Sequence, residues 1–191
     1  RRRGSMHQVY FVRHGETVWN VENKICGATE SPLTARGREQ ARAIGRELRA
    51  RMDAGELKLD RMLCSPLSRA RDTAEEIANI LELPLAVDVR LREQNFGKWE
   101  GTARDGEGFQ RAKENFIDSF SGGESMMRVA QRIYNLLDEL REEKDTSYLL
   151  VAHNGISRIV ESYFRDMENE EFASFGIRNA ALRAYSFPEE G

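Results

Sequence analysis

The chain of 191 residues has few cysteines, few histidines and no long apolar run. Cys26 and Cys64 are too few and too widely spaced for a disulfide-stapled secreted fold, so we expect reduced thiols in a cytoplasmic protein. Neither cysteine has a cysteine or histidine nearby at ligand spacing, so we assign no metal and no cofactor. No apolar stretch reaches the roughly 20 residues that a membrane-spanning helix needs. We therefore expect no membrane association.

Excess positive charge is also lacking. The formal net charge is −3, and it becomes more negative without residues 1–5 (RRRGS), which precede Met6 and lack the apolar core of a signal peptide. We interpret these residues as an expression scar. Because proteins that bind nucleic acid present a broad basic face, we expect no nucleic-acid partner. Repeats, linkers and low-complexity tracts are absent, and we predict one domain over residues 6–191.

Strand-like runs alternate with amphipathic segments along the chain. The spacing of apolar residues predicts strands over residues 8–12, 59–64, 85–89, 148–152 and 181–187. It predicts helices from a Thr34 cap to Met52, from the Ser65-Pro66 turn to Leu81, from Ser125 to Glu143 and from Ile156 to Phe164. Residues 94–123 are expected to be irregular. This alternation indicates an α/β three-layer sandwich with a mainly parallel central sheet flanked by helices.

Two of the three histidines directly follow predicted strands. His14 ends the first strand, inside Arg13-His14-Gly15, and His153 ends the strand over residues 148–152. The third, His7, lies close to the expected expression scar at residues 1–5. Because ligands of α/β proteins bind at the carboxyl ends of the strands, we expect His14 and His153 to project into one pocket.

A metal-free protein that acts on a phosphoryl group needs cationic donors, a nucleophile in line with the leaving oxygen and a proton donor. Arg13 and Arg69 supply guanidinium groups, whose planar fork donates two hydrogen bonds to a phosphate. An imidazole between two guanidinium groups is discouraged from charging, so the lone pair of His14 stays available for attack. Glu93 follows the third predicted strand, and we expect its carboxylate to reach the same pocket as His14 and His153.

The motifs that carry these residues also follow one another in a recognisable order. They are Arg13-His14-Gly15-Glu16-Thr17, Ser31-Pro32-Leu33-Thr34, Ser65-Pro66-Leu67-Ser68-Arg69-Ala70, Glu93 with Phe96-Gly97, and His153. In order and spacing this set resembles the histidine phosphatase superfamily, in its phosphoglycerate mutase-like branch. The resemblance spans nearly the whole chain and implies a phosphoglycerate mutase-like fold.

The resemblance implies roles for individual residues. His14 is then the nucleophile that is phosphorylated on a ring nitrogen, and Glu93 is the general acid and base. The phosphate pocket then consists of Arg13, Arg69, His153 and Asn20, and we expect further substrate contacts from Gly27, Ala28 and Asn154. Cys26 stands where many relatives carry glutamine or threonine, and because a thiol donates poorly we assign it no substrate contact.

The activity expected from this resemblance is metal-independent hydrolysis of small phosphorylated metabolites. Phosphoglycerate mutases of the family carry a longer segment after the glutamate, with a tyrosine where Phe96 stands and an arginine where Gln94 stands. The shorter, more open site favours water as the acceptor. Phosphoglycerate mutase activity is the alternative, followed by a non-catalytic module that binds phosphorylated ligands. The oligomeric state is not indicated.

Simpler interpretations exist for several of these residues. Arg69 has the spacing of a surface ion pair with Asp72, and Glu93 has Arg90 and Arg92 as neighbours. Residues 94–123 are expected to form a lid or specificity segment. Its aromatic residues either line a pocket or form the underside of the lid: Trp99, Phe109, Phe116 and Phe120, mixed with Lys98, Arg104, Arg111 and Lys113.

Overall fold

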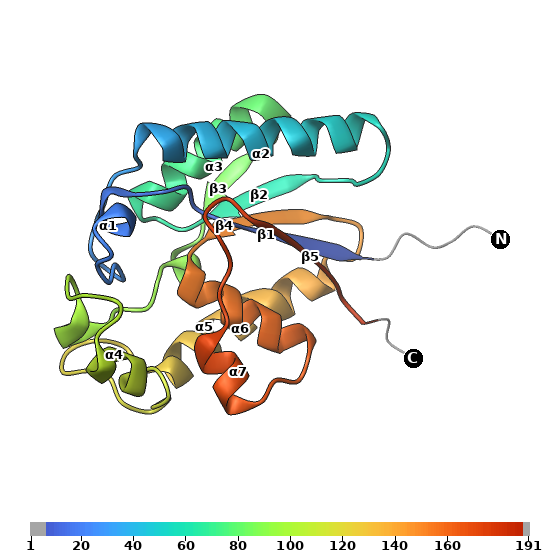
Figure 1. Ribbon diagram of the computed structural model, residues 1–191. Helices are drawn as coiled ribbons and strands as arrows, with labels where there is room; N and C mark the ends of the chain where they lie inside the picture. Colours follow the sequence, from blue (N-terminus) through green and yellow to red (C-terminus); the bar gives the residue numbers. More distant parts are fainter. Residues whose placement is uncertain (1–6, 189–191) are drawn as a thin grey trace.

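A five-stranded sheet forms the centre of the computed structural model, which describes residues 7–188 (Figure 1). The expected scar at residues 1–5 lies outside the described residues. The strand order is β3-β2-β4-β1-β5, with β1 at Gln8–Arg13, β2 at Arg61–Cys64, β3 at Leu85–Val87, β4 at Tyr148–Ala152 and β5 at Leu182–Ser186. Among the strands of residues 7–188, only β5 is antiparallel to its neighbour. The predicted α/β fold with a mainly parallel sheet is confirmed.

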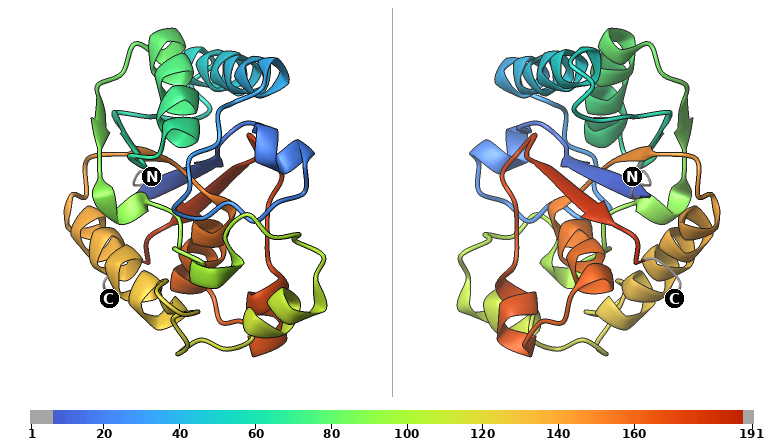
Figure 2. Two further views of the ribbon diagram at one scale, coloured as in Figure 1. Left: turned by 90° about the vertical axis from the view of Figure 1, so that its left-hand side faces the viewer. Right: turned by 90° about the vertical axis from the view of Figure 1, so that its right-hand side faces the viewer.

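Helices cover both faces of this sheet (Figures 1 and 2). On one side lie α2 (Ala35–Asp53) and α3 (Ser68–Leu81), and on the other lie α5 (Met126–Glu142), α6 (Asn154–Phe164) and α7 (Asn169–Ser174). The short helices α1 (Val18–Val21) and α4 (Glu107–Ala112) lie at the end of the sheet where β1 ends. Short 3-10 turns occur at Val89–Leu91 and Gly97–Trp99. The result is the expected three-layer arrangement.

The alternation of side chains along the strands produces two cores. In β1, Val9 and Phe11 pack with α5 and α6, whereas Tyr10 and Val12 pack with α2 and α3. The strands β1 and β4 are therefore apolar on both faces, which explains why they appear as unbroken hydrophobic runs in the sequence. Cys64 is fully buried at the end of β2, within the core under α2 and α3.

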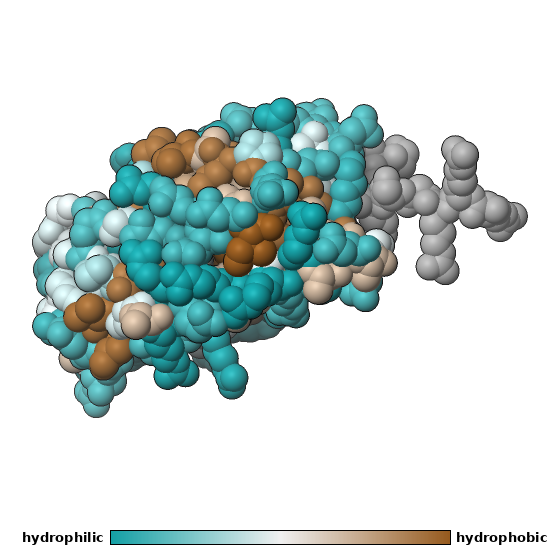
Figure 3. Space-filling view, turned by 90° about the horizontal axis from the view of Figure 1, so that it is seen from above, coloured by the Kyte–Doolittle hydropathy of each residue, from teal (hydrophilic) through white to brown (hydrophobic). Residues whose placement is uncertain are grey.

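The outer surface of α2 and α3 is mainly polar. Seen from above, hydrophilic residues cover most of this face, with smaller hydrophobic areas between them (Figure 3). Arg38 and Arg42 of α2 form ion pairs with Glu76 of α3. Within residues 7–188, no helix is long and apolar enough to cross a membrane.

The boundaries of several elements differ from the predictions. Residues 85–89 form a strand only as far as Val87, because the side chain of Asp88 accepts a hydrogen bond from the backbone N–H of Arg90 (3.0 Å) and starts a 3-10 turn. The segment expected to be irregular contains α4, and α6 begins at Asn154 rather than at Ile156. The predicted Thr34 cap of α2 is confirmed, since its hydroxyl accepts from the N–H of Gly37 (3.0 Å).

Candidate active site

The strand register places the two strand-end histidines next to each other. Arg13 of β1 pairs with Ala152 of β4, so the residues that follow them, His14 and His153, come at the same level of the sheet. The N–H of His14 donates to the carbonyl of Ala152 (3.0 Å). The two imidazole centroids lie 5.3 Å apart. The two histidines are therefore adjacent, but only His14 lines the pocket, so the expectation that both project into it is wrong for His153.

The imidazole of His14 is held in one tautomer. Its Nδ1 lies 2.7 Å from the carbonyl oxygen of Gly15, and because a carbonyl only accepts, Nδ1 carries the proton and Nε2 keeps its lone pair. Burial lowers the pKa of His14 well below its usual value, and the charges of Arg13 and Arg69 lower it further. The ring is therefore neutral at pH 7, with Nε2 as its free nucleophilic atom.

A close contact between two glycines fixes the loop that carries this carbonyl. A Cβ on Gly15 would overlap the backbone of Gly37 in α2, and a Cβ on Gly37 would overlap the carbonyl of Glu16. The N–H of Gly15 also donates to the hydroxyl of Thr73 in α3 (3.1 Å). The helix layer thus holds the turn that orients His14.

Arg13 and Arg69 are buried without carboxylate partners among the described residues. Arg13 donates to the carbonyl of Ile177 (2.7 Å), and Arg69 donates to the carbonyls of Thr29 (2.8 Å) and Gly27 (2.7 Å). Burial lowers the pKa of Arg13 to about 10, so it remains charged at neutral pH. Since no ion pair joins Arg69 to Asp72, the simpler interpretation of Arg69 is wrong.

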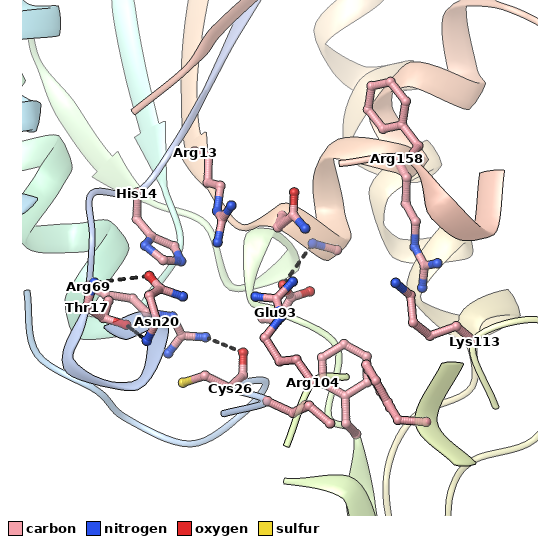
Figure 4. A pocket seen from close by; sticks show the side chains of 16 residues that line it. Arg13, His14, Thr17, Asn20, Cys26, Arg69, Glu93, Arg104, Lys113 and Arg158 are labelled. Atoms are coloured by element: carbon pink, nitrogen blue, oxygen red, sulfur yellow. Dashed lines mark hydrogen bonds between the residues drawn. The ribbon is translucent and has the colours of Figure 1, made fainter. Parts of the chain in front are cut away.

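Asn20 is fixed by the helix start on which it stands. Its Oδ1 accepts from the N–H of Thr17 (3.0 Å), and its own N–H donates to the hydroxyl of Thr17 (3.2 Å), a reciprocal capping box. The amide of Asn179 also donates to Asn20 Oδ1 (3.2 Å). The side chain of Asn20 lines the same pocket as His14 (Figure 4).

Glu93 faces His14 across the pocket (Figure 4). Its carboxylate is buried and accepts from the backbone N–H groups of Gln94 (2.8 Å) and Gly155 (2.9 Å). A Cβ on Gly155 would overlap this carboxylate, so the glycine after β4 lets the two loops meet.

The flanking arginines of Glu93 have other partners. Arg90 binds Asp88 and Glu139, whereas Arg92 lies 3.6 Å from Glu124. Glu93 is therefore not the surface ion-pair partner that its sequence neighbours allow.

His153 lies behind the pocket rather than on its wall. It is fully buried, and its Nε2 lies 2.7 Å from the hydroxyl of Ser65. Its Nδ1 has no hydrogen-bond partner among the described residues. Burial and then the charge of Arg69 lower the pKa of His153 well below its usual value. The imidazole is neutral at pH 7.

The loop of residues 26–29 is organised differently from the expectation. The N–H groups of Gly27 (2.9 Å) and Ala28 (2.6 Å) donate to the carboxylate of Glu100, and neither residue is part of the pocket wall. Cys26 does line the pocket, but its thiol donates to the carbonyl of Thr29 (3.2 Å) and burial raises its pKa to about 11. The backbone N–H groups of Gly27 and Ala28 are therefore not free to make the substrate contacts predicted for these residues.

One continuous pocket collects most of the expected residues at the carboxyl ends of the strands. Arg13, His14, Asn20, Arg69, Glu93 and Asn154 line it, together with Thr17, Ile25, Cys26, Phe96, Arg104, Phe109, Lys113, Gly155, Arg158 and Phe175. The aromatic residues of the expected lid divide their roles. Phe96 and Phe109 reach the pocket, whereas Trp99 and Phe120 pack in a small core beneath them.

Arg158 and Phe175 are pocket residues that the sequence interpretation missed. Phe175 follows the short helix α7, which has no long apolar period to reveal it. Arg158 had a signal, because it stands four residues after Asn154 on α6 and positions i and i+4 share one face of a helix.

The arrangement is suited to one kind of chemistry. A neutral imidazole, buried guanidinium groups and a carboxylate surround a pocket at the carboxyl ends of the parallel strands. This combination of groups is suited to binding and cleaving phosphate esters. Within residues 7–188, no cluster of three or more histidine, cysteine or acidic side chains is arranged to hold a metal ion.

Comparison with known proteins agrees with this class. The model of the histidine phosphatase superfamily (branch 1) matches residues 9–191, and the chain belongs to this superfamily. Among curated proteins, "Probable phosphoglycerate mutase GpmB" of Salmonella choleraesuis is 36% identical over 159 residues, which cover 80% of this chain and 71% of that protein.

Solved structures of phosphatases have the same fold. A mycobacterial glucosyl-3-phosphoglycerate phosphatase superposes with a TM-score of 0.78 at 29% identity, covering 93% of this chain and 89% of the other. The alpha-ribazole phosphatase of Shigella flexneri gives 0.76 at 28% identity, with coverages of 93% and 89%. The chain therefore resembles both phosphatases and a mutase of one superfamily, whose phosphatases act on small phosphorylated substrates.

Proposed function

We propose that this protein is a metal-independent phosphomonoesterase that hydrolyses small phosphorylated metabolites through a phosphohistidine intermediate on His14. The observation that carries the proposal is the hydrogen bond from His14 Nδ1 to the Gly15 carbonyl (2.7 Å). It leaves Nε2 unprotonated between two guanidinium groups, which is the state that a nitrogen nucleophile needs.

In the first half-reaction, His14 Nε2 attacks phosphorus and the bond from phosphorus to the ester oxygen breaks. Glu93, in its protonated form, gives its proton to the departing alkoxide. The negative charge of the transferred phosphoryl group is stabilised by Arg13 and Arg69, with Asn20 as a further donor. We assign His153 a supporting role: its neutral ring packs beside that of His14, 5.3 Å away between centroids, behind the pocket.

In the second half-reaction, water replaces the alcohol. The carboxylate of Glu93 takes a proton from water as the water oxygen bonds to phosphorus, and the bond from phosphorus to His14 Nε2 breaks. Phosphate leaves, His14 is again neutral, and Glu93 is again protonated. Glu93 is thus acid in one half and base in the other.

Hydrolysis is favoured over phosphoryl transfer between positions of one substrate by the residues after Glu93. The amide of Gln94 donates to the carbonyl of Glu124 (2.8 Å) and so is turned away from the pocket. Phe96 packs edge-on against Phe109 and offers no hydroxyl. Gln94 and Phe96 therefore supply no polar contact for the part of the substrate beyond its phosphate. We propose that residues 94–123 act as a lid that leaves water access to the phosphohistidine.

Phosphoglycerate mutase activity is the second candidate, because the 36% identity is to a protein of that name. A module that binds phosphorylated ligands without turnover is the third. The retained nucleophile and carboxylate argue against that module, since neither is needed for binding alone.

The test is release of inorganic phosphate from p-nitrophenyl phosphate in the presence of a chelator. We expect release by the native protein and by His7→Ala, which changes a histidine at the opposite end of β1 from His14, hydrogen-bonded to the carbonyl of Leu140 (2.9 Å). We expect no release by His14→Ala. Dependence on added divalent metal, or phosphate binding without turnover, would overturn the proposal.

A parallel assay with 3-phosphoglycerate separates the two enzymatic activities. Phosphate release without formation of the 2-isomer supports the phosphatase, whereas isomer formation at a higher rate than phosphate release identifies a mutase.

A further inference from the structure

The turn that carries Glu93 is held from outside the pocket by one side chain of α5. Arg132 of this helix is buried and is not part of the pocket wall. Its Nη1 donates to the carbonyls of Arg90 (2.5 Å) and Arg92 (2.7 Å). Its Nη2 donates to the carbonyl of Glu93 itself (3.3 Å). A single guanidinium group thus fixes the backbone of residues 90–93 to α5.

Glu124 completes this contact and compensates its charge. Its carboxylate accepts from Nε (3.1 Å) and Nη2 (2.9 Å) of Arg132. Together with the three carbonyls, these contacts match all five N–H donors of the side chain. The carbonyl of Glu124 also accepts from the Gln94 amide (2.8 Å), and its N–H donates to the carbonyl of Asn95 (2.8 Å). The pair of Arg132 and Glu124 therefore holds the chain on both sides of Glu93.

This contact acts on the main chain of Glu93, while the pocket acts on its side chain. The carboxylate accepts from the N–H of Gly155 (2.9 Å) at the start of α6, and the carbonyl of the same residue is bound by α5. Every donor of Arg132 is used and its charge is paired, so it has no capacity left to bind a phosphate. What Arg132 controls is where the carboxylate lies. Placement matters because a displacement of about 1 Å can cost about 10²-fold in rate.

We propose that Arg132 is the positioning residue of the acid–base carboxylate: by fixing the carbonyls of residues 90, 92 and 93 to α5, it sets the place from which Glu93 transfers protons. The inference rests on the proposed phosphatase mechanism, in which Glu93 protonates the departing alkoxide and then activates water. A change at Arg132 should therefore resemble a change at Glu93. It should not resemble a change at Arg13 or Arg69, which are placed to hold the phosphate.

The experiment compares two esters that differ in their need for an acid. The p-nitrophenolate of p-nitrophenyl phosphate leaves without a proton, whereas the alkoxide of propyl phosphate needs one. The variants are Arg132→Met and Arg132→Lys, with Glu93→Gln as the reference. The matched control is Arg128→Met, because Arg128 is an exposed arginine about one turn earlier on the same helix. The ratio of kcat/KM for the two esters, measured on one preparation, does not depend on how much of the protein is folded.

We expect Arg132→Met to lower kcat/KM for propyl phosphate by about 10²-fold and to change kcat/KM for p-nitrophenyl phosphate little. Arg132→Lys should have a smaller effect of the same kind, because an ammonium group has three donors and reaches only some of the five acceptors. Arg128→Met should match the native protein. Inorganic phosphate should inhibit all of these proteins equally, since Arg13 and Arg69 are unchanged.

With p-nitrophenyl phosphate, a displaced Glu93 has a second signature. The value of kcat/KM covers the steps up to departure of the first product, whereas kcat also includes hydrolysis of the phosphohistidine, which needs Glu93 as base. Arg132→Met and Glu93→Gln should therefore lower kcat and KM together. A variant that is only less well folded would lower kcat at an unchanged KM, because fewer molecules are active.

The reference variant separates the ways in which the idea can fail. If Glu93→Gln loses activity selectively on propyl phosphate while the Arg132 variants lose none, or lose it equally on both esters, Arg132 does not position Glu93. If Glu93→Gln affects both esters equally, Glu93 is not the acid and Arg132 has no such role. If the native protein hydrolyses neither ester, the proposed function itself fails.

Discussion

At the scale of single residues, the hydrogen bond between His14 and the Gly15 carbonyl decides what the pocket can do. It assigns the proton to Nδ1, while burial and two guanidinium groups keep a second proton off the ring. The same two arginines that are suited to hold a phosphate thus keep the imidazole nucleophilic. The chemistry depends on both effects acting on one side chain.

This arrangement predicts the protonation state of His14 directly. Because its pKa is lowered well below the usual value, the neutral form should persist from about pH 6 to about pH 8. Nitrogen NMR of the imidazole should show Nδ1 protonated and Nε2 bare throughout this range. A titration of His14 near pH 6.5, or a proton on Nε2, would contradict the account.

Glu93 yields a prediction that separates proton transfer from phosphate binding. Glu93→Gln should lower kcat for esters with poor leaving groups by about 10²- to 10⁴-fold, because the amide cannot protonate the alkoxide. Inhibition by inorganic phosphate should change little. Glu47→Gln, an exposed change on α2, is the control. Undiminished turnover of an alkyl ester by the Glu93 variant would remove Glu93 from the mechanism.

The positions of Arg13 and His14 could be predicted from the sequence better than that of His153, which lies behind the pocket wall, or those of residues in loops. Arg13 and His14 could be predicted because the end of a parallel strand fixes where the next side chains lie. The N–H groups of Gly27 and Ala28 could not, because their partner, Glu100, is more than 70 positions away in the chain. No local pattern reveals a carboxylate that reaches across such a distance.

At the scale of elements, Glu100 connects the lid to the loop that holds Arg69. Its carboxylate accepts from the N–H groups of Gly27, Ala28 and Phe96, and the carbonyls of this loop hold the Arg69 guanidinium. Both carboxylate oxygens face donors. An amide at this position would turn an NH₂ group toward an N–H, whichever way it is oriented.

Glu100→Gln should therefore weaken both the loop and the phosphate site. We expect a loss of about 1–3 kcal/mol in the free energy of unfolding, measured in urea. We also expect a higher inhibition constant for inorganic phosphate, because Arg69 loses its support. Glu107→Gln, which removes only an exposed pair with Arg111 on α4, should change neither quantity. An unchanged inhibition constant for phosphate in Glu100→Gln would show that Glu100 of the lid does not support phosphate binding by Arg69.

The elements that were predicted correctly have long apolar periods or continuous apolar runs. The strand at Tyr148–Ala152 and the helix at Met126–Glu142 are of this kind. The helix Val18–Val21 has no buried residue and depends on a capping box between Thr17 and Asn20. Hydrophobic periodicity contains no signal for such a helix, which explains why it was missed.

At the scale of the whole molecule, the pocket joins segments from both ends of the chain. Its inner wall comes from the ends of β1 and β4 and the start of α3, whose neighbourhood follows from the sheet order. Its outer wall comes from the lid, α6 and the segment after α7. The fold class could be predicted from alternating patterns, but this outer wall depends on how three helices pack, and no single segment encodes that.

The charge of the outer wall predicts a pH dependence. Arg158, Arg104, Glu93 and the ring of Phe109 surround Lys113, whose pKa is lowered to about 8. Lys113 is charged below this pH and neutral above it. Therefore kcat/KM for a phosphate monoester dianion should fall as the pH rises through about 8, because the pocket that binds it loses a positive charge, and Lys113→Arg should remove this fall. An identical alkaline profile in native and variant proteins would show that Lys113 does not contribute.

The central claim is that His14 carries a covalent phosphoryl group in each turnover, and intact-protein and peptide mass spectrometry test it most directly. Glu93→Gln should accumulate the adduct with p-nitrophenyl phosphate, because the good leaving group needs no acid while hydrolysis loses its base. After an alkaline quench, we expect one acid-labile phosphoryl group on the peptide that contains His14. A phosphoryl group on another residue, or turnover with no covalent adduct, would contradict it.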